Sequence, residues 1–222
     1  MDEKRLMERL AGVAGILFAI LFVVGAVMAE TPDPGQPAKW VTWFSDSGHR
    51  SELIVNGYLW VLAGLCMAIM IAALYQRFGS REGVAGLYAN IAGLAAIIFT
   101  AVLLVAGVGN ASVAGNVAFG GANVPQDGDL LVQLGQQGMA FVLLAGGLSA
   151  ALALAAVSLL IMREDGPRWL AVLGFIAAIC CIFGVVFIPM IALPIWMICA
   201  SIILLTRKSA AGVRRSAPVP AA

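Results

Sequence analysis

The sequence is poor in charged side chains. Asp, Glu, Lys and Arg make up 11% of its 222 residues, and 62% of the residues are hydrophobic. Soluble domains carry roughly 25% charged residues. A soluble fold of this length has too little interior to bury so much apolar surface, so we expect the bilayer to be the solvent. The net charge of +1 gives no indication of a nucleic-acid partner.

Cysteine and histidine, the common metal ligands, are also scarce. The four cysteines, Cys66, Cys180, Cys181 and Cys199, all lie within apolar runs and form no Cys-x-x-Cys or Cys/His metal spacing. We expect them to behave as small inert hydrophobes. His49 is the single histidine, which excludes a haem held between two histidines. We therefore predict no metal and no cofactor.

Ionisable residues are absent from the long apolar runs except at their ends. Ion-coupled transport and voltage sensing usually need charged groups inside a membrane span, and acid–base catalysis needs titratable side chains. The sequence therefore argues against an ion pump, a proton relay and an intramembrane enzyme. The amides of Asn56 and Asn90 stand out among the polar groups that remain. They are typical of hydrogen bonds between helices, or else of polar points in a ligand cavity.

Six apolar segments are long enough, or nearly so, to cross a bilayer, which takes about 20 residues. The last 37 apolar residues would form a helix about 55 Å long, nearly twice the hydrocarbon thickness, so we expect them to turn once, at Pro189 and Pro194. The predicted fold is all-α, with a six-helix transmembrane domain over residues 1–207. The predicted spans are about residues 10–29, 53–75, 84–108, 130–162, 170–188 and 190–206.

Lysine and arginine predict the orientation, because short cytoplasmic loops are enriched in both. Eleven of these residues fall on one side of the predicted spans, and two, Lys39 and Arg50, fall on the other. Both termini are therefore predicted to be cytoplasmic, with external loops over 30–52 and 109–129 and a disordered cytoplasmic tail over 208–222. Small residues at 26–29 also fit a signal-peptide cleavage site, but the first apolar run is longer than usual for that role, and we expect an uncleaved span.

The first external loop contains a short amphipathic segment. Trp40, Trp43 and Phe44 are spaced i, i+3, i+4, which predicts one face of a helix, and Pro37 suits its first turn. Gly48 is the expected left-handed stop. Tryptophan favours the head-group region of a bilayer, so we predict an interfacial anchor with its aromatic face toward the lipid.

Polar side chains collect directly after this segment. Asp46, His49 and Arg50 are candidate ligand-binding residues at the mouth of the bundle, together with Asn56 and Asn90 within the spans. One histidine among carboxylates is a poor metal signature. The alternative interpretation is that these residues only cap the helices beside them.

The second external loop, 109–129, is rich in Gly and Asn and is expected to be a flexible lid or an irregular plug. Asn110-Ala-Ser112 in it fits the glycosylation pattern. Either Asp127 or Asp129 is expected to cap the fourth span.

Three segments carry a resemblance to a known family: AGILF at 14–18, PRWLAVLGFIAA at 167–178 and IALPIWMICASIILLTRK at 191–208. They resemble a bacterial family of six-span integral membrane proteins of unknown function, and the Ala- and Gly-rich style looks actinobacterial. The resemblance implies a multi-pass protein of the bacterial inner membrane and brings no catalytic residues with it.

The sequence thus favours a non-enzymatic inner-membrane protein. We expect a membrane-complex subunit or accessory factor, or a protein that binds a lipid-like apolar molecule between its helices. Its expected partners are membrane lipids and either another membrane protein or further copies of the chain. The alternative is a small permease for neutral or hydrophobic solutes, favoured by the proline-containing turn near 189–194.

Overall fold

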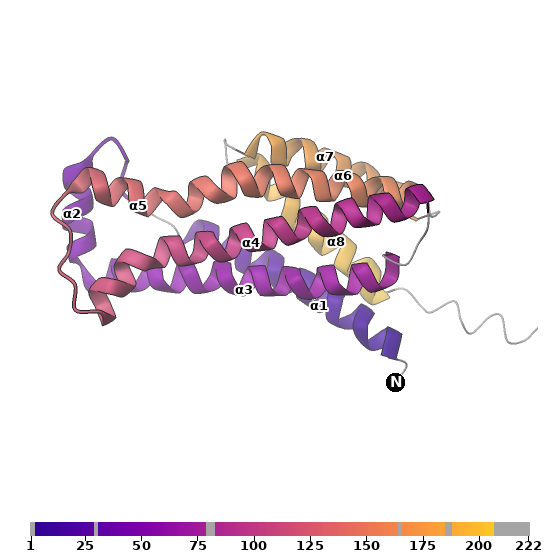
Figure 1. The fold of residues 1–222 in the computed structure, drawn as a ribbon, viewed down its shortest axis with the longest axis horizontal. Coiled ribbons are helices and arrows are strands. Elements are labelled where there is room, and N and C mark those ends of the chain that lie inside the picture. Colours follow the sequence, from indigo (N-terminus) through magenta and orange to yellow (C-terminus); the bar gives the residue numbers. More distant parts are fainter. Residues whose placement is uncertain (1–2, 29–30, 79–82, 164–165, 185–187, 207–222) are drawn as a thin grey trace, which may run out of the picture.

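The structure is a computed structural model that describes residues 3–28, 31–78, 83–163, 166–184 and 188–206 (Figure 1). These residues form helices and connecting segments, with no strand among them. The predicted tail at 208–222 lies outside the described residues. The helices are α1 (Glu3–Val27), α2 (Pro37–Ser45), α3 (Ser47–Phe78), α4 (Gly83–Phe119), α5 (Gly128–Phe141), a π-helical segment η1 (Val142–Gly146), α6 (Gly147–Arg163), α7 (Arg168–Ile182), a 3-10 turn η3 (Ile188–Ile191) and α8 (Ala192–Thr206).

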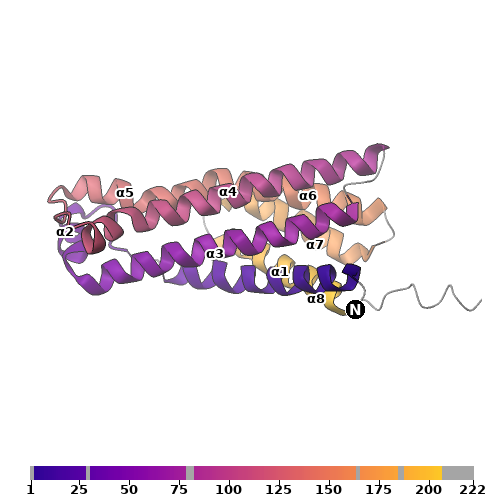
Figure 2. The ribbon, with the colours of Figure 1, turned by 60° about the horizontal axis from the view of Figure 1, so that its bottom comes forward.

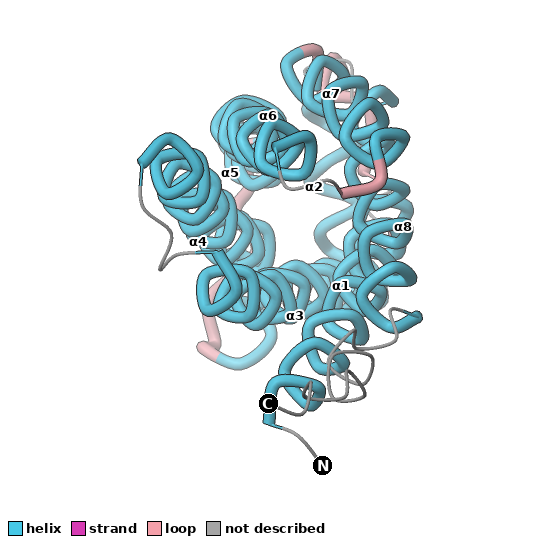
Figure 3. Tube along the Cα trace, turned by 90° about the vertical axis from the view of Figure 1, so that its right-hand side faces the viewer, coloured by secondary structure: helices cyan, strands magenta, loops and turns pink. Residues whose placement is uncertain are grey.

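Six helices close into a ring. Each packs against its two neighbours in the order α1, α3, α4, α6, α7, α8, and α8 returns to α1. Figure 3 shows this ring seen along the bundle, with α2 and α5 behind it. Because α3 and α4 are longer than α1, they extend past its end, and α2 and α5 cover this extended end (Figures 1 and 2).

Four helical segments are long and apolar enough to cross a membrane. They are Leu6–Val27, Ser47–Ala73, Gly86–Phe119 and Gly128–Arg163, the last made of α5, η1 and α6 together. The helices α7 and α8 are apolar but have 15 residues each, about 22 Å against a hydrocarbon thickness of about 30 Å. The prediction of an all-helical protein with membrane-spanning helices is confirmed at this level.

The outer surface of the ring suits lipid. Leu94, Ile97 and Leu148 are more than half exposed, and many other Leu, Ile and Val side chains are similarly exposed. Water would make such a surface aggregate, whereas lipid tails match it. The core inside the ring contains an aromatic cluster in which Phe18 stacks on Phe22 and meets Phe99 edge-on.

Glycine allows a close helix crossing between α3 and α4. A methyl group added at Gly57 would lie 2.6 Å from the carbonyl oxygen of Gly107, and one added at Gly107 would lie 2.6 Å from that of Gly57. Neither residue therefore tolerates a side chain. Small residues at such positions let membrane helices approach closely, which gains dispersion energy where no hydrophobic effect separates helix from lipid.

The end of the bundle beyond α1 contains a second small core. Trp40 and Phe44 of α2 are fully buried there with Leu53, Ala114 and Leu131. The ring of Trp40 fills the space over Gly135 of α5, where an added methyl group would overlap it. Trp40 and Phe44 on the aromatic face of α2 therefore contact protein, while Trp43 is half-buried and stacks on His49. The interfacial anchor expected for this face stays a prediction.

Two loop expectations were wrong. Residues 109–119 are not irregular but continue α4 to Phe119, because Asn110 and Ala114 are buried against neighbouring helices and this packing overrides the low helix propensity of Gly and Asn. Gly48 is not a left-handed stop. It lies in the first turn of α3, and the helix break falls at Asp46, whose backbone is extended at φ −75° and ψ 126°.

Two other local expectations are confirmed. Pro37 is the first residue of α2. Asp127 caps α5, since its Oδ1 accepts hydrogen bonds from the backbone N–H of Asp129 at 3.0 Å and of Leu130 at 3.1 Å. Pro194 is the third residue of α8. Proline is tolerated in the first turn of a helix, because the backbone N–H groups there have no partner within the helix.

Candidate functional site

An apolar cavity lies inside the ring, between α3, α4, α6 and α8. The cavity itself is small, about 60 Å³, and it is open on one side. Alanines of α4 and α6 leave this space, because their methyl groups do not reach the centre of the ring. All the lining residues are apolar: Met67, Met70, Ile71, Ala89, Ala92, Gly93, Ala96, Ala150, Ala153, Leu154, Val157, Leu160, Leu193, Trp196 and Met197.

The methionine and tryptophan side chains in the wall come from α3 and α8. Met67, Met70 and Met197 are unbranched and polarisable, so they adapt to the shape of a neighbouring group. Trp196 has a fixed position, because its indole N–H donates a hydrogen bond to the carbonyl oxygen of Leu170 at 3.1 Å. With that donor satisfied, the indole presents an apolar surface to the cavity.

A groove runs along the outer face of α3 and α4. Its lining from α3 is Ala68, Ile71 and Ala72, and its lining from α4 runs from Asn90 to Leu104. Ile71 and Gly93 line both this groove and the central cavity. Two polar side chains stand among the described residues of the groove. The amide of Asn90 is exposed, while the hydroxyl of Thr100 is buried and has no hydrogen-bond partner in the described part of the chain.

Asn56 lies elsewhere, in a buried hydrogen-bonded link between three helices. Its Nδ2 donates to the carbonyl oxygen of Gly25 in α1. Its Oδ1 accepts a hydrogen bond from Nδ2 of Asn110 in α4 at 3.3 Å. Gly138 of α5 packs directly on the amide of Asn110, which leaves no room for a side chain there. Asn56 is fully buried, so it joins helices and lines neither the cavity nor the groove.

Asn110 is the residue that the sequence interpretation missed. Its side chain is 6% exposed and lies within a helix, so its amide is not presented for glycosylation. The Asn-x-Ser pattern and the surrounding glycines suggested a surface loop. One sequence signal could have indicated its hydrogen bond with Asn56. An amide so close to a predicted span needs a hydrogen-bond partner, and Asn56 is a second amide at the same end of the bundle.

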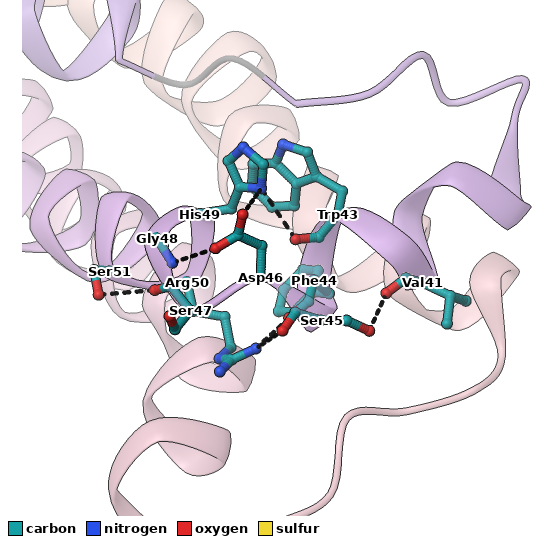
Figure 4. A network of polar contacts seen from close by, with 10 residues as sticks. All are labelled: Val41, Trp43, Phe44, Ser45, Asp46, Ser47, Gly48, His49, Arg50 and Ser51. Atoms are coloured by element: carbon teal, nitrogen blue, oxygen red, sulfur yellow. Dashed lines mark hydrogen bonds and ion pairs between the residues drawn. The ribbon is translucent and has the colours of Figure 1, made fainter.

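The structure brings Asp46, His49 and Arg50 together at the corner between α2 and α3 (Figure 4). Asp46 Oδ1 accepts a hydrogen bond from the N–H of Gly48 at 2.7 Å. Arg50 Nη1 donates to the carbonyl oxygens of Phe44 at 2.6 Å and Ser45 at 2.8 Å, which are orphaned at the end of α2. These contacts cap the two helices and fix the corner.

His49 belongs to the same corner. Its ring stacks on Trp43 with the ring centres 4.6 Å apart, and its Nδ1 lies 3.2 Å from the carbonyl oxygen of Trp43. Its Nδ1 also lies 3.9 Å from Asp46 Oδ2. Among the described residues, no group of three or more His, Cys, Asp or Glu side chains is arranged to hold a metal ion.

The candidate residues predicted from the sequence therefore fall into three separate places. Asp46, His49 and Arg50 form a helix corner, Asn56 a buried helix link, and Asn90 part of the outer groove. The cavity wall contains none of them, because its residues are apolar and carry no chemical signature in the sequence.

Comparison with known proteins gives one match. Residues 10–208 match a family model described as "Domain of unknown function (DUF4386)". No curated protein and no solved structure matches the chain.

Proposed function

The chain belongs to the DUF4386 family, a family of unknown function, and on this premise we propose that it is a non-enzymatic membrane protein that binds an apolar, lipid-like molecule inside its helical ring. The observation that carries the proposal is the central cavity. Its lining is wholly apolar, and ligand pockets are lined predominantly by apolar side chains.

Hydrocarbon is the chemistry that such a wall recognises. An ion or a polar solute would lose its hydration and gain no hydrogen bond from this lining, which costs several kcal/mol. A hydrocarbon chain already in the bilayer gains almost nothing by transfer, since lipid tails are as apolar as leucine. Binding then depends on dispersion contacts and fit, which the adaptable Met67, Met70 and Met197 provide.

The test is native mass spectrometry of the gently purified protein and of Ala153→Leu, which fills the cavity from α6. Ala118→Leu is the matched control, because Ala118 is exposed near the end of α4 and lines no part of the cavity. We expect the wild type and the control to retain an added lipid mass that Ala153→Leu loses. Equal retention by all three proteins contradicts the proposal.

A second candidate role is that of a subunit or accessory factor in a membrane complex. The outer groove between α3 and α4 favours it, because the exposed amide of Asn90 is suited to a hydrogen bond with another membrane helix, from another protein or from a second copy of the chain. Crosslinking through a cysteine at Ile97, which is 56% exposed in this groove, tests it. A crosslinked product that contains a second protein or a second copy of the chain supports this role. Recovery of the chain only as an uncrosslinked monomer contradicts it.

We further propose that α7 and α8 also cross the membrane, which gives six spans with both termini cytoplasmic, and that the membrane is a bacterial inner membrane. The closed ring supports six spans, since α7 and α8 complete it, and local thinning of the bilayer accommodates short spans. The distribution of Lys and Arg, eleven against two, supports the orientation. A C-terminal reporter active only in the cytoplasm is the expected result, and a periplasmic one contradicts the topology.

A further inference from the structure

The central cavity and the lipid-facing groove adjoin at Ile71 of α3 and Gly93 of α4, which line both. We propose that the ligand is a neutral single-chain amphiphile that enters sideways from the bilayer between α3 and α4. Its chain passes between Ile71 and Gly93 into the cavity, and its head group stays outside and hydrogen-bonds Asn90. This inference rests on the proposed function, since it concerns the same cavity.

The head group is placed by the distribution of polar atoms. The cavity wall offers no polar side chain, so a hydrogen-bonding head inside it would be left unsatisfied. Asn90 is three residues before Gly93, about 4.5 Å along the helix axis, and its amide is exposed in the groove. A head group at Asn90 therefore leaves the first carbons of its chain at the opening beside Gly93.

The charge of the head group follows from the side chains around it. No Asp, Glu, Lys, Arg or His is among the described residues that line the cavity or the groove. A charged head would find no countercharge there, whereas an amide both donates and accepts hydrogen bonds with a hydroxyl or an ester. The class indicated is a long-chain alcohol or a monoacylglycerol.

The number of chains follows from the proposed entry route. A head group held at Asn90 brings every chain attached to it to the same gap between Ile71 and Gly93. The cavity spans Ala89 to Ala96 on α4, about 10 Å along the axis. A two-chain lipid would leave its second chain outside, so a single-chain molecule places the larger share of its hydrocarbon in contact with the cavity wall.

The experiment is a titration by native mass spectrometry with three probes: 1-monooleoylglycerol, oleate, and dioleoylphosphatidylcholine. The wild type should bind monooleoylglycerol most tightly. Gly93→Leu, which narrows the opening, should lose this binding, and Asn90→Leu should weaken it about 3- to 30-fold, the range of a hydrogen bond in a membrane. Thr100→Val is the matched control, because Thr100 lines the same groove about 15 Å beyond Asn90 and its buried hydroxyl should not contact the head group.

Three results would overturn the inference. Binding of oleate or of the phospholipid as tight as that of monooleoylglycerol contradicts the neutral single-chain class. Unchanged binding by Gly93→Leu contradicts the route between α3 and α4, and an equal effect of Thr100→Val and Asn90→Leu contradicts the position of the head group. Each of these leaves the cavity itself as the site. If Ala153→Leu binds every probe as tightly as the wild type does, the proposed function is contradicted as well.

Discussion

Replacing Asn56 with alanine removes the buried link that joins α1, α3 and α4. The wild-type side chain makes two hydrogen bonds, to the carbonyl oxygen of Gly25 and from Nδ2 of Asn110. Hydrogen bonds between membrane helices are worth about 0.6–2 kcal/mol each, and the buried amide of Asn110 is left without its partner, at a further cost of about 1–3 kcal/mol. We therefore expect Asn56→Ala to lower the free energy of unfolding by about 2–7 kcal/mol.

The assay is reversible unfolding in mixed micelles, followed by circular dichroism. Asn123→Ala is the matched control, because Asn123 is exposed between α4 and α5, and it should change stability by less than about 0.5 kcal/mol. Adding Asn110→Ala gives a double-mutant cycle, in which the two sites should be coupled by about 0.6–2 kcal/mol. A loss below 0.5 kcal/mol for Asn56→Ala, or additive effects in the cycle, would refute the link.

Three further predictions concern packing and capping. Gly107→Ala should destabilise the α3–α4 crossing by about 1–3 kcal/mol or more in the same unfolding assay. Gly115 has open space around it, so Gly115→Ala should be neutral or slightly stabilising, and equal effects of the two substitutions would contradict the close crossing. Gly135→Ala should displace the ring of Trp40 and change the tryptophan fluorescence, and an unchanged spectrum would argue against this packing. Asp127→Ala should cost about 0.5–2 kcal/mol through loss of the α5 cap, and no loss on unfolding would show that the cap contributes nothing.

Hydropathy predicted where the helices lie but not how they pack. Apolar runs that leave no charge inside the membrane must be helical, because the bilayer offers no partner for the backbone, and this located the helices from α1 to α8. The order of helices around the ring depends on contacts such as Gly57 against Gly107, which look in sequence like any other glycines. The extension of α4 to Phe119 was missed because Ala114 and Asn110 are held by tertiary packing that overrides local propensity.

The candidate site was harder to predict than the fold. Polar residues attracted attention in the sequence, yet Asp46, His49 and Arg50 bond mainly to backbone groups and to each other at one helix corner. The cavity is made by alanines and methionines on particular faces of α4, α6, α3 and α8, and composition does not reveal which face of a helix is turned inward when most of its residues are apolar. Asn90, a candidate ligand-binding residue in the sequence, lines the outer groove and not the cavity.

The central claim, that a hydrocarbon chain occupies the cavity, is tested most directly by photo-crosslinking with a diazirine-bearing acyl chain, followed by peptide mapping. The account predicts adducts on Met67 and Met70 of α3 and on Leu193 and Met197 of α8, which line the cavity, and their loss in Ala153→Leu. Adducts confined to lipid-facing positions such as Leu94 and Leu148, and unchanged by Ala153→Leu, would contradict it.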